Sequence, residues 1–75
     1  MSQCLRDAVL AAGIGGEVIY RPDTGTETTF SVEHFDAEEV KLVSVSGHYH
    51  GVPSREFYRF DNHWSLKPHW RLAGT

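Results

Sequence analysis

The sequence contains a single cysteine, Cys4, among 75 residues. One thiol cannot form a disulfide within the chain, and it supplies only one of the four ligands that a structural zinc site needs. The chain therefore lacks the disulfide or zinc framework of many small secreted domains. We expect it to reside in a reducing cytoplasm.

Long hydrophobic runs are also missing. No segment approaches the roughly 20 apolar residues that cross a bilayer. Residues 1–16 lack the basic start and the continuous apolar stretch of a secretory signal. We expect a soluble, unprocessed chain that does not enter a membrane.

Internal repeats, linkers and low-complexity tracts are absent as well. Hydrophobic residues make up 40% of the sequence and charged residues 23%, which is enough apolar surface to offset the entropy cost of folding. The chain is too short for a barrel enzyme or a dinucleotide-binding fold. We therefore predict one compact domain over residues 1–75, with a small free energy of unfolding.

The spacing of apolar residues predicts one helix followed by strands. Near the N-terminus they recur every three or four positions, as on one face of an amphipathic helix, and Ser2 is a suitable N-cap. From residue 17 the period changes to two, which is typical of strands with one solvated face. The apolar stripe and the glycines that end the helix are Leu5, Ala8, Val9, Ala12, Gly13, Gly15 and Gly16.

Alternation predicts strands at residues 17–21, 27–33, 40–45, 55–60 and 64–67, with a short last segment at 70–72. The first two strands form a hairpin, and 55–60 and 64–67 form a second hairpin around residues 61–63. Before 40–45, Asp36 and Glu39 resemble a capping box, so we allow a single helical turn there. Asp36, Glu38 and Glu39 would then be acidic residues at a helix start.

These elements predict an α+β fold, with the N-terminal helix packed on a four- or five-stranded antiparallel sheet. A small SH3-like open β-barrel is the alternative. The predicted core consists of Leu5, Val9, Val18, Tyr20, Phe30, Val32, Val40, Val45, Tyr58, Phe60, Trp64 and Leu66.

The net charge of −3 is unevenly distributed along the chain. Residues 1–47 hold eight acidic and three basic side chains, whereas residues 48–75 hold four basic side chains, two acidic ones and four of the five histidines. This division predicts a dipolar molecule unless folding interleaves the two parts. The negative total opposes attraction to phosphate backbones, so nucleic acid ranks below protein as a partner.

The segment 55–59 is the main candidate for a binding surface. On a strand, Arg55, Phe57 and Arg59 share one face, and Glu56 and Tyr58 share the other. If Tyr58 points into the core, the Phe57 ring stands in solvent between two guanidinium groups. Exposed rings beside arginines are enriched at protein interfaces.

We therefore predict a non-enzymatic interaction protein, an accessory factor or inhibitor that docks on a larger protein through a basic and aromatic surface of the C-terminal hairpin. No cofactor is predicted. An exposed edge strand would also allow two copies to pair, so the oligomeric state stays open. The predicted partner-binding residues are Arg55, Phe57, Arg59, Trp70 and Arg71.

Two other functions would use the same region. The basic and aromatic stripe could stack bases, which would make the chain a nucleic-acid-binding module. Alternatively, His63 and His69 could serve as general base and general acid of a small metal-independent ribonuclease, with the nearby arginines holding the phosphate. No carboxylate that would orient either imidazole is evident in the sequence.

His48 and His50 form a His-x-His unit, whose imidazoles would face the same side of a strand and could bind a metal ion. A third ligand at a recognisable spacing is missing, so we predict no metal site. Cys4 lies in the first helical turn without an identifiable histidine partner. We therefore interpret it as a structural thiol rather than a nucleophile.

Overall fold

The computed structural model describes residues 3–46 and 54–74. Along the chain these residues form a helix, four strands, a short helix and a further strand. Their bounds are α1 Leu5–Ala12, β1 Glu17–Tyr20, β2 Thr28–Phe35, β3 Glu39–Ser46, β4 Arg55–Arg59, α2 His63–Leu66 and β5 Trp70–Leu72.

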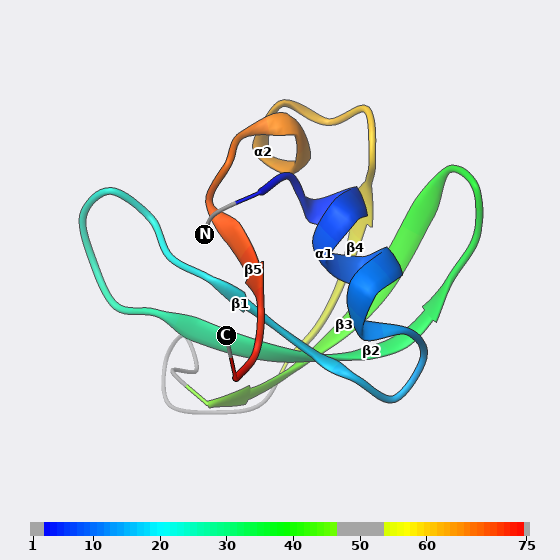
Figure 1. Cartoon of the computed structure of the whole chain (residues 1–75), viewed down its shortest axis with the longest axis horizontal. Helices are drawn as coiled ribbons and strands as arrows, with labels where there is room; N and C mark the ends of the chain where they lie inside the picture. The colour runs from blue at the N-terminus through cyan, green and yellow to red at the C-terminus, as the bar shows by residue number, and fades with distance from the viewer. Residues whose placement is uncertain (1–2, 47–53, 75) are drawn as a thin grey trace.

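The strands form one antiparallel sheet in the order β4-β3-β2-β1-β5. β1 to β4 follow one another as a meander, and β5 returns to pair with the free side of β1. Both helices lie on one side of the strands (Figure 1), and α1 packs its apolar stripe on that face. Within the described residues β4 and β5 do not pair, so the sheet stays open. This confirms the predicted α+β fold over the barrel alternative.

Helix α1 has the predicted apolar face, because Leu5, Ala8 and Val9 are all fully buried. Its start was predicted wrongly: the N-cap is Cys4 rather than Ser2, and the Cys4 side chain makes no capping hydrogen bond. At the C-terminal end, Gly13 has a φ of 73° and its N–H donates to the Val9 carbonyl over 2.8 Å. Glycine adopts this conformation at little cost, which is why the helix stops there. Neither helix of the described chain is long and apolar enough to span a bilayer.

The first predicted hairpin is present, with Val18 opposite Phe30 and both side chains in the core. β3 differs from the prediction at its end. Val40 and Leu42 point inward and are buried, whereas Val45 is 43% exposed. Val40 and Val45 lie an odd number of residues apart, so on a regular strand they cannot share a face. The prediction of Val45 as a core residue was therefore wrong.

The second predicted hairpin is absent, because residues 63–66 form the short helix α2 instead of a strand. The Asn62 side chain caps this helix by accepting a hydrogen bond from the N–H of Trp64 over 2.9 Å. Trp64 and Leu66, both predicted in the core, are mostly exposed. Local capping by Asn62 thus outweighs the strand propensity of this segment.

Trp70 occupies the centre of the aromatic part of the core. It is 1% exposed, and its ring centroid lies 4.8 Å from that of Tyr20, 5.6 Å from that of Tyr58 and 5.9 Å from that of Phe30. The indole N–H donates to the Trp64 carbonyl over 3.3 Å, so the polar end of the ring is also partnered. β5 is thereby fixed to β1, to β4 and to the chain around α2.

The two tryptophans provide a matched test of this core. We expect Trp70→Ala to destabilise the domain by about 3–5 kcal/mol. For a domain of this size, that loss leaves most molecules unfolded at room temperature. Trp64→Ala should change stability by less than about 0.5 kcal/mol, because its ring is 52% exposed. Thermal unfolding followed by circular dichroism measures both. Equal losses in the two variants would contradict the assignment of Trp70 as the central core residue.

Candidate functional site

Strand β4 presents two different faces. Its inward residue Tyr58 packs against the core, and the following Phe60 is buried. The pleat therefore turns the alternate side chains to the other side of the sheet. The Phe57 side chain is 65% exposed, so its predicted outward orientation is confirmed. Arg55 and Arg59 flank it on the same face.

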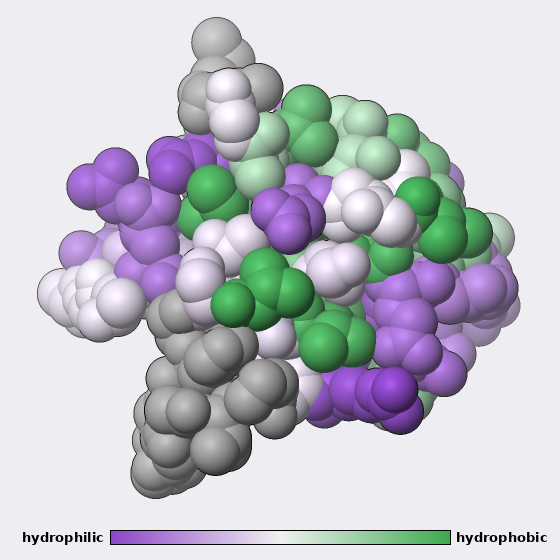
Figure 2. Space-filling model, turned by 90° about the horizontal axis from the view of Figure 1, so that it is seen from below, coloured by the Kyte–Doolittle hydropathy of each residue, from purple (hydrophilic) through white to green (hydrophobic). Residues whose placement is uncertain are grey.

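This outer face lies on the side of the sheet opposite α1 and α2. Strand pairing places Lys41 and Val43 of β3 on it, beside Phe57 and Arg55. Figure 2 looks at the molecule from the side opposite the helices and shows separate apolar areas among polar ones. The Lys41 ammonium lies 5.2 Å from the centroid of the Phe57 ring, within the range of a cation–π interaction. The sequence analysis had not included Lys41, although its position opposite Phe57 follows once the strand register is known.

β4 is an edge strand, and its outward-facing residues also expose their backbone. The Phe60 N–H donates to Glu38 and the Ser44 N–H donates to Ser54, so the ladder to β3 uses the even-numbered residues of this segment. In an antiparallel pair, the backbone groups of the intervening residues point away from the partner strand. The N–H and C=O groups of Arg55 and Phe57 therefore point away from β3, to the edge of the sheet at which no described strand pairs with β4.

The arginines beside Phe57 have acidic neighbours. Arg55 Nε lies 3.6 Å from a Glu33 carboxylate oxygen, and Arg59 lies 3.2 Å from Asp61 and 3.9 Å from Glu38. The hydrogen bond and the charge of Asp61 raise the pKa of Arg59 above its ordinary value. Folding thus interleaves acidic and basic parts of the chain here, which weakens the predicted charge division.

Two residues predicted for this surface lie elsewhere. Trp70 is buried, so its side chain cannot contact a partner, and its assignment as a partner-binding residue was wrong. Arg71 faces outward from β5, the opposite edge strand, and donates to Glu27 over 2.7 Å. Four strand spacings separate β5 from β4, about 19 Å along the sheet. The structure therefore brings together Arg55, Phe57 and Arg59 but not Arg71.

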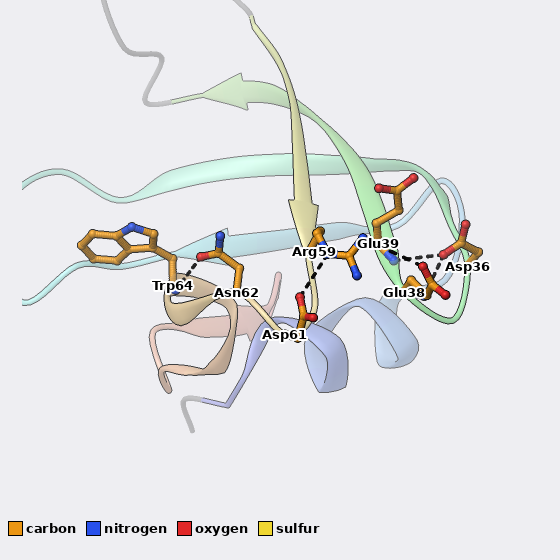
Figure 3. Close-up of polar contacts among 7 residues, drawn as sticks. All are labelled: Asp36, Glu38, Glu39, Arg59, Asp61, Asn62 and Trp64. Atoms are coloured by element: carbon orange, nitrogen blue, oxygen red, sulfur yellow. Dashed lines mark hydrogen bonds and ion pairs between the residues drawn. The ribbon is translucent and has the colours of Figure 1, made fainter.

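Asp36 forms the turn between β2 and β3, where the sequence allowed a helical turn. Its Oδ1 accepts hydrogen bonds from the backbone N–H groups of Glu38 and Glu39, over 2.8 and 3.0 Å. Figure 3 shows this carboxylate at the end of the hairpin, with its hydrogen bonds to Glu38 and Glu39 drawn as dashed lines. The two backbone hydrogen bonds lower the pKa of Asp36 below its ordinary value of 3.8, because they favour the charged form.

His63 and His69, the two histidines predicted as general base and general acid, have different neighbours in the structure. His63 lies against the Trp64 ring in α2, whereas His69 packs edge-on against Tyr20 with its Nδ1 3.9 Å from Asp23. Within residues 3–46 and 54–74, no hydrogen bond or ion pair joins the two imidazoles. No group of three metal-ligating side chains occurs in this part of the chain either. His48 and His50 lie outside the described residues.

Comparison with known proteins gives no family assignment. No family model matches the chain, and no curated protein or solved structure is significantly similar to it. The candidate site therefore rests on its own geometry and chemistry.

The Asp36 turn predicts an acid-sensitive hairpin beside the site. The pKa of Asp36 is lowered in the folded state, so its contribution to stability is present above the unfolded-state pKa and is lost as the pH falls through the folded-state pKa. We expect wild type to be more stable than Asp36→Asn near neutral pH, the difference to begin to shrink as the pH falls to about 4, and to vanish only below the lowered folded-state pKa. Urea unfolding at several pH values measures this, and a constant difference across that range would contradict it.

Proposed function

We propose that this chain is a non-enzymatic interaction protein that docks on a larger protein through the outer face of β4. Phe57 forms the centre of the docking surface, and Arg55 and Arg59 flank it. The observation that carries the proposal is the 65% exposure of the Phe57 ring on the sheet face opposite α1 and α2. Moving an exposed aromatic ring from water into an interface with a partner lowers the free energy of the complex.

The charged neighbours of Phe57 support a protein partner. Exposed ion pairs such as those of Arg55 and Arg59 contribute little to folding stability, so both guanidinium groups can exchange their carboxylates for groups on a partner. The same carboxylates reduce the positive charge that a phosphate backbone would require. These charges therefore favour a protein surface over nucleic acid.

The free edge of β4 supports the same proposal. The backbone groups of Arg55 and Phe57, which pair with no strand within residues 3–46 and 54–74, can hydrogen-bond to an extended segment of a partner. These bonds fix the direction of that segment, while Phe57 supplies apolar contact. An accessory factor or inhibitor acting in the cytoplasm needs only such a surface, since it performs no chemistry of its own. The single cysteine of the chain is compatible with that reducing compartment.

Phe57 can be tested against an exposed apolar residue on another element. We expect Phe57→Ala to weaken binding of the partner by about 30-fold, corresponding to about 2 kcal/mol for a central interface residue. Arg59→Glu should also weaken binding. Leu10→Ala, on α1 and 57% exposed, should leave it unchanged. All three variants should unfold at nearly the wild-type temperature.

The measurement begins with affinity capture from native extract and mass spectrometry, followed by titration of the purified partner with each variant. Equal binding by wild type and Phe57→Ala would refute the docking surface, as would an equal loss with Leu10→Ala. A fluorescent oligonucleotide that binds at low salt and is released steeply by added salt would instead support a nucleic-acid-binding module.

A further inference from the structure

A hollow of about 180 Å³ lies on the inner face of the sheet, behind the docking surface. Strands β1 to β4 all contribute to it, so its walls belong to the folded sheet. Three kinds of group surround it: aromatic rings, hydroxyl groups and one carboxylate. The lining residues are Tyr20, Thr28, Phe30, Ser44, Ser54, Glu56 and Tyr58.

The carboxylate is Glu56, which alternation places on the inward side of β4 between Arg55 and Phe57. It is half-buried and accepts a hydrogen bond from the Tyr58 hydroxyl over 2.7 Å. Burial and this bond raise the pKa of the Tyr58 phenol above its ordinary value, so the hydroxyl stays protonated and continues to donate.

No cation within residues 3–46 and 54–74 forms an ion pair with Glu56, in contrast to Glu27, Glu33 and Glu38 on the outer surface. A carboxylate that is partly removed from water is normally compensated by a positive charge. The Tyr58 hydroxyl supplies only a neutral donor. The hollow therefore carries a negative charge without a cationic partner in the described chain.

The aromatic rings around the hollow are oriented at steep angles to one another. The ring centroids of Phe30 and Tyr58 lie 6.5 Å apart with an interplanar angle of 76°, and the Tyr58 ring makes an angle of 74° with the neighbouring Trp70 ring. Rings at such angles form adjacent walls rather than a flat stack. The negative faces of aromatic rings attract organic cations, most strongly where water is excluded.

The hydroxyl groups set the polar rim of the hollow. Ser44 is buried, and its Oγ accepts a hydrogen bond from the Ser54 N–H over 2.8 Å, with the two Oγ atoms 3.5 Å apart. The volume holds several waters at about 30 Å³ each but is below the roughly 300 Å³ of a typical drug-sized pocket. A ligand of this hollow is therefore small.

We propose that this hollow binds a small organic ammonium ion, with Glu56 opposing its charge and the Tyr20, Phe30 and Tyr58 rings enclosing its carbon atoms. A single carboxylate is too few ligands for a divalent metal ion, which favours an organic cation. The ammonium group can belong to a free metabolite or to a lysine side chain. The site is independent of the docking function, because it uses the opposite face of β4.

The test titrates the full chain with three small-molecule probes, and ¹H–¹⁵N NMR spectra of its amide signals measure the binding of each probe. Choline represents a methylated ammonium, n-butylammonium represents the end of a lysine side chain, and 3,3-dimethylbutan-1-ol is the uncharged isostere of choline. We expect at least one ammonium to bind at millimolar concentration and to shift the amide signals of Ser54, Glu56 and Tyr58. The neutral isostere should bind at least about tenfold more weakly, since it lacks the charge that Glu56 opposes.

Two variants separate the charge of the hollow from the charge of the molecule. Glu56→Gln should lower the affinity for the ammonium at least about tenfold, whereas Glu33→Gln, which removes an equal charge from the outer face, should leave it unchanged. Phe57→Ala should also bind the ammonium normally, so this result does not depend on the docking surface.

Preference for choline would identify a methylated ligand, and preference for n-butylammonium a primary amine, and either result supports the proposal. It is overturned if neither ammonium shifts these signals at tens of millimolar, or if the isostere binds as well as choline. Equal losses in Glu56→Gln and Glu33→Gln would overturn it too. The comparison of choline with its isostere needs no variant, so misfolding of Glu56→Gln would leave the proposal open to refutation.

Discussion

Tyr58 packs against Trp70 with 5.6 Å between the ring centroids, and the arrangement of β4 depends on this contact. Because Tyr58 is held inward, the pleat turns Phe57 outward and places Glu56 on the inner face. Trp70 belongs to β5, at the far edge of the sheet from β4. The sheet must therefore curve enough for side chains from its two edge strands to meet over the β2 residue Phe30. The aromatic cluster thus orients the proposed docking surface as well as stabilising the domain.

The two faces of β4 differ in how their charges are compensated. On the outer face, Arg55 and Arg59 have acidic neighbours close by and remain accessible to a partner. On the inner face, Glu56 has a hydroxyl donor but no cation in the described part of the chain. Exposed pairs can be exchanged at little cost, whereas a half-buried charge favours a ligand of opposite sign. One short strand can therefore contribute to a macromolecular interface and to a small hollow.

Several elements could be predicted because their signals are local. The apolar spacing of Leu5, Ala8 and Val9 indicates α1, and alternation indicates the hairpin of β1 and β2 and the outward position of Phe57. The segment 63–66 could not be predicted from alternation, because a single side-chain cap from Asn62 decided between strand and helix. Trp70 was misplaced because alternation over three residues does not tell which face meets the core. Glu56 had a usable signal, since its parity with Tyr58 already placed a carboxylate on the inner face.

The sequence by itself determined the fold class, the first hairpin and the two-sided character of residues 55–59, since these depend on the period of the side chains along a strand. The tertiary structure decided which strands lie at the edges, that Trp70 is buried and that Arg71 lies far from Phe57 along the sheet. It also paired the arginines with acidic residues from distant parts of the chain and joined four strands around one hollow. These features depend on strand order, which arises from long-range packing and has no local pattern in the sequence.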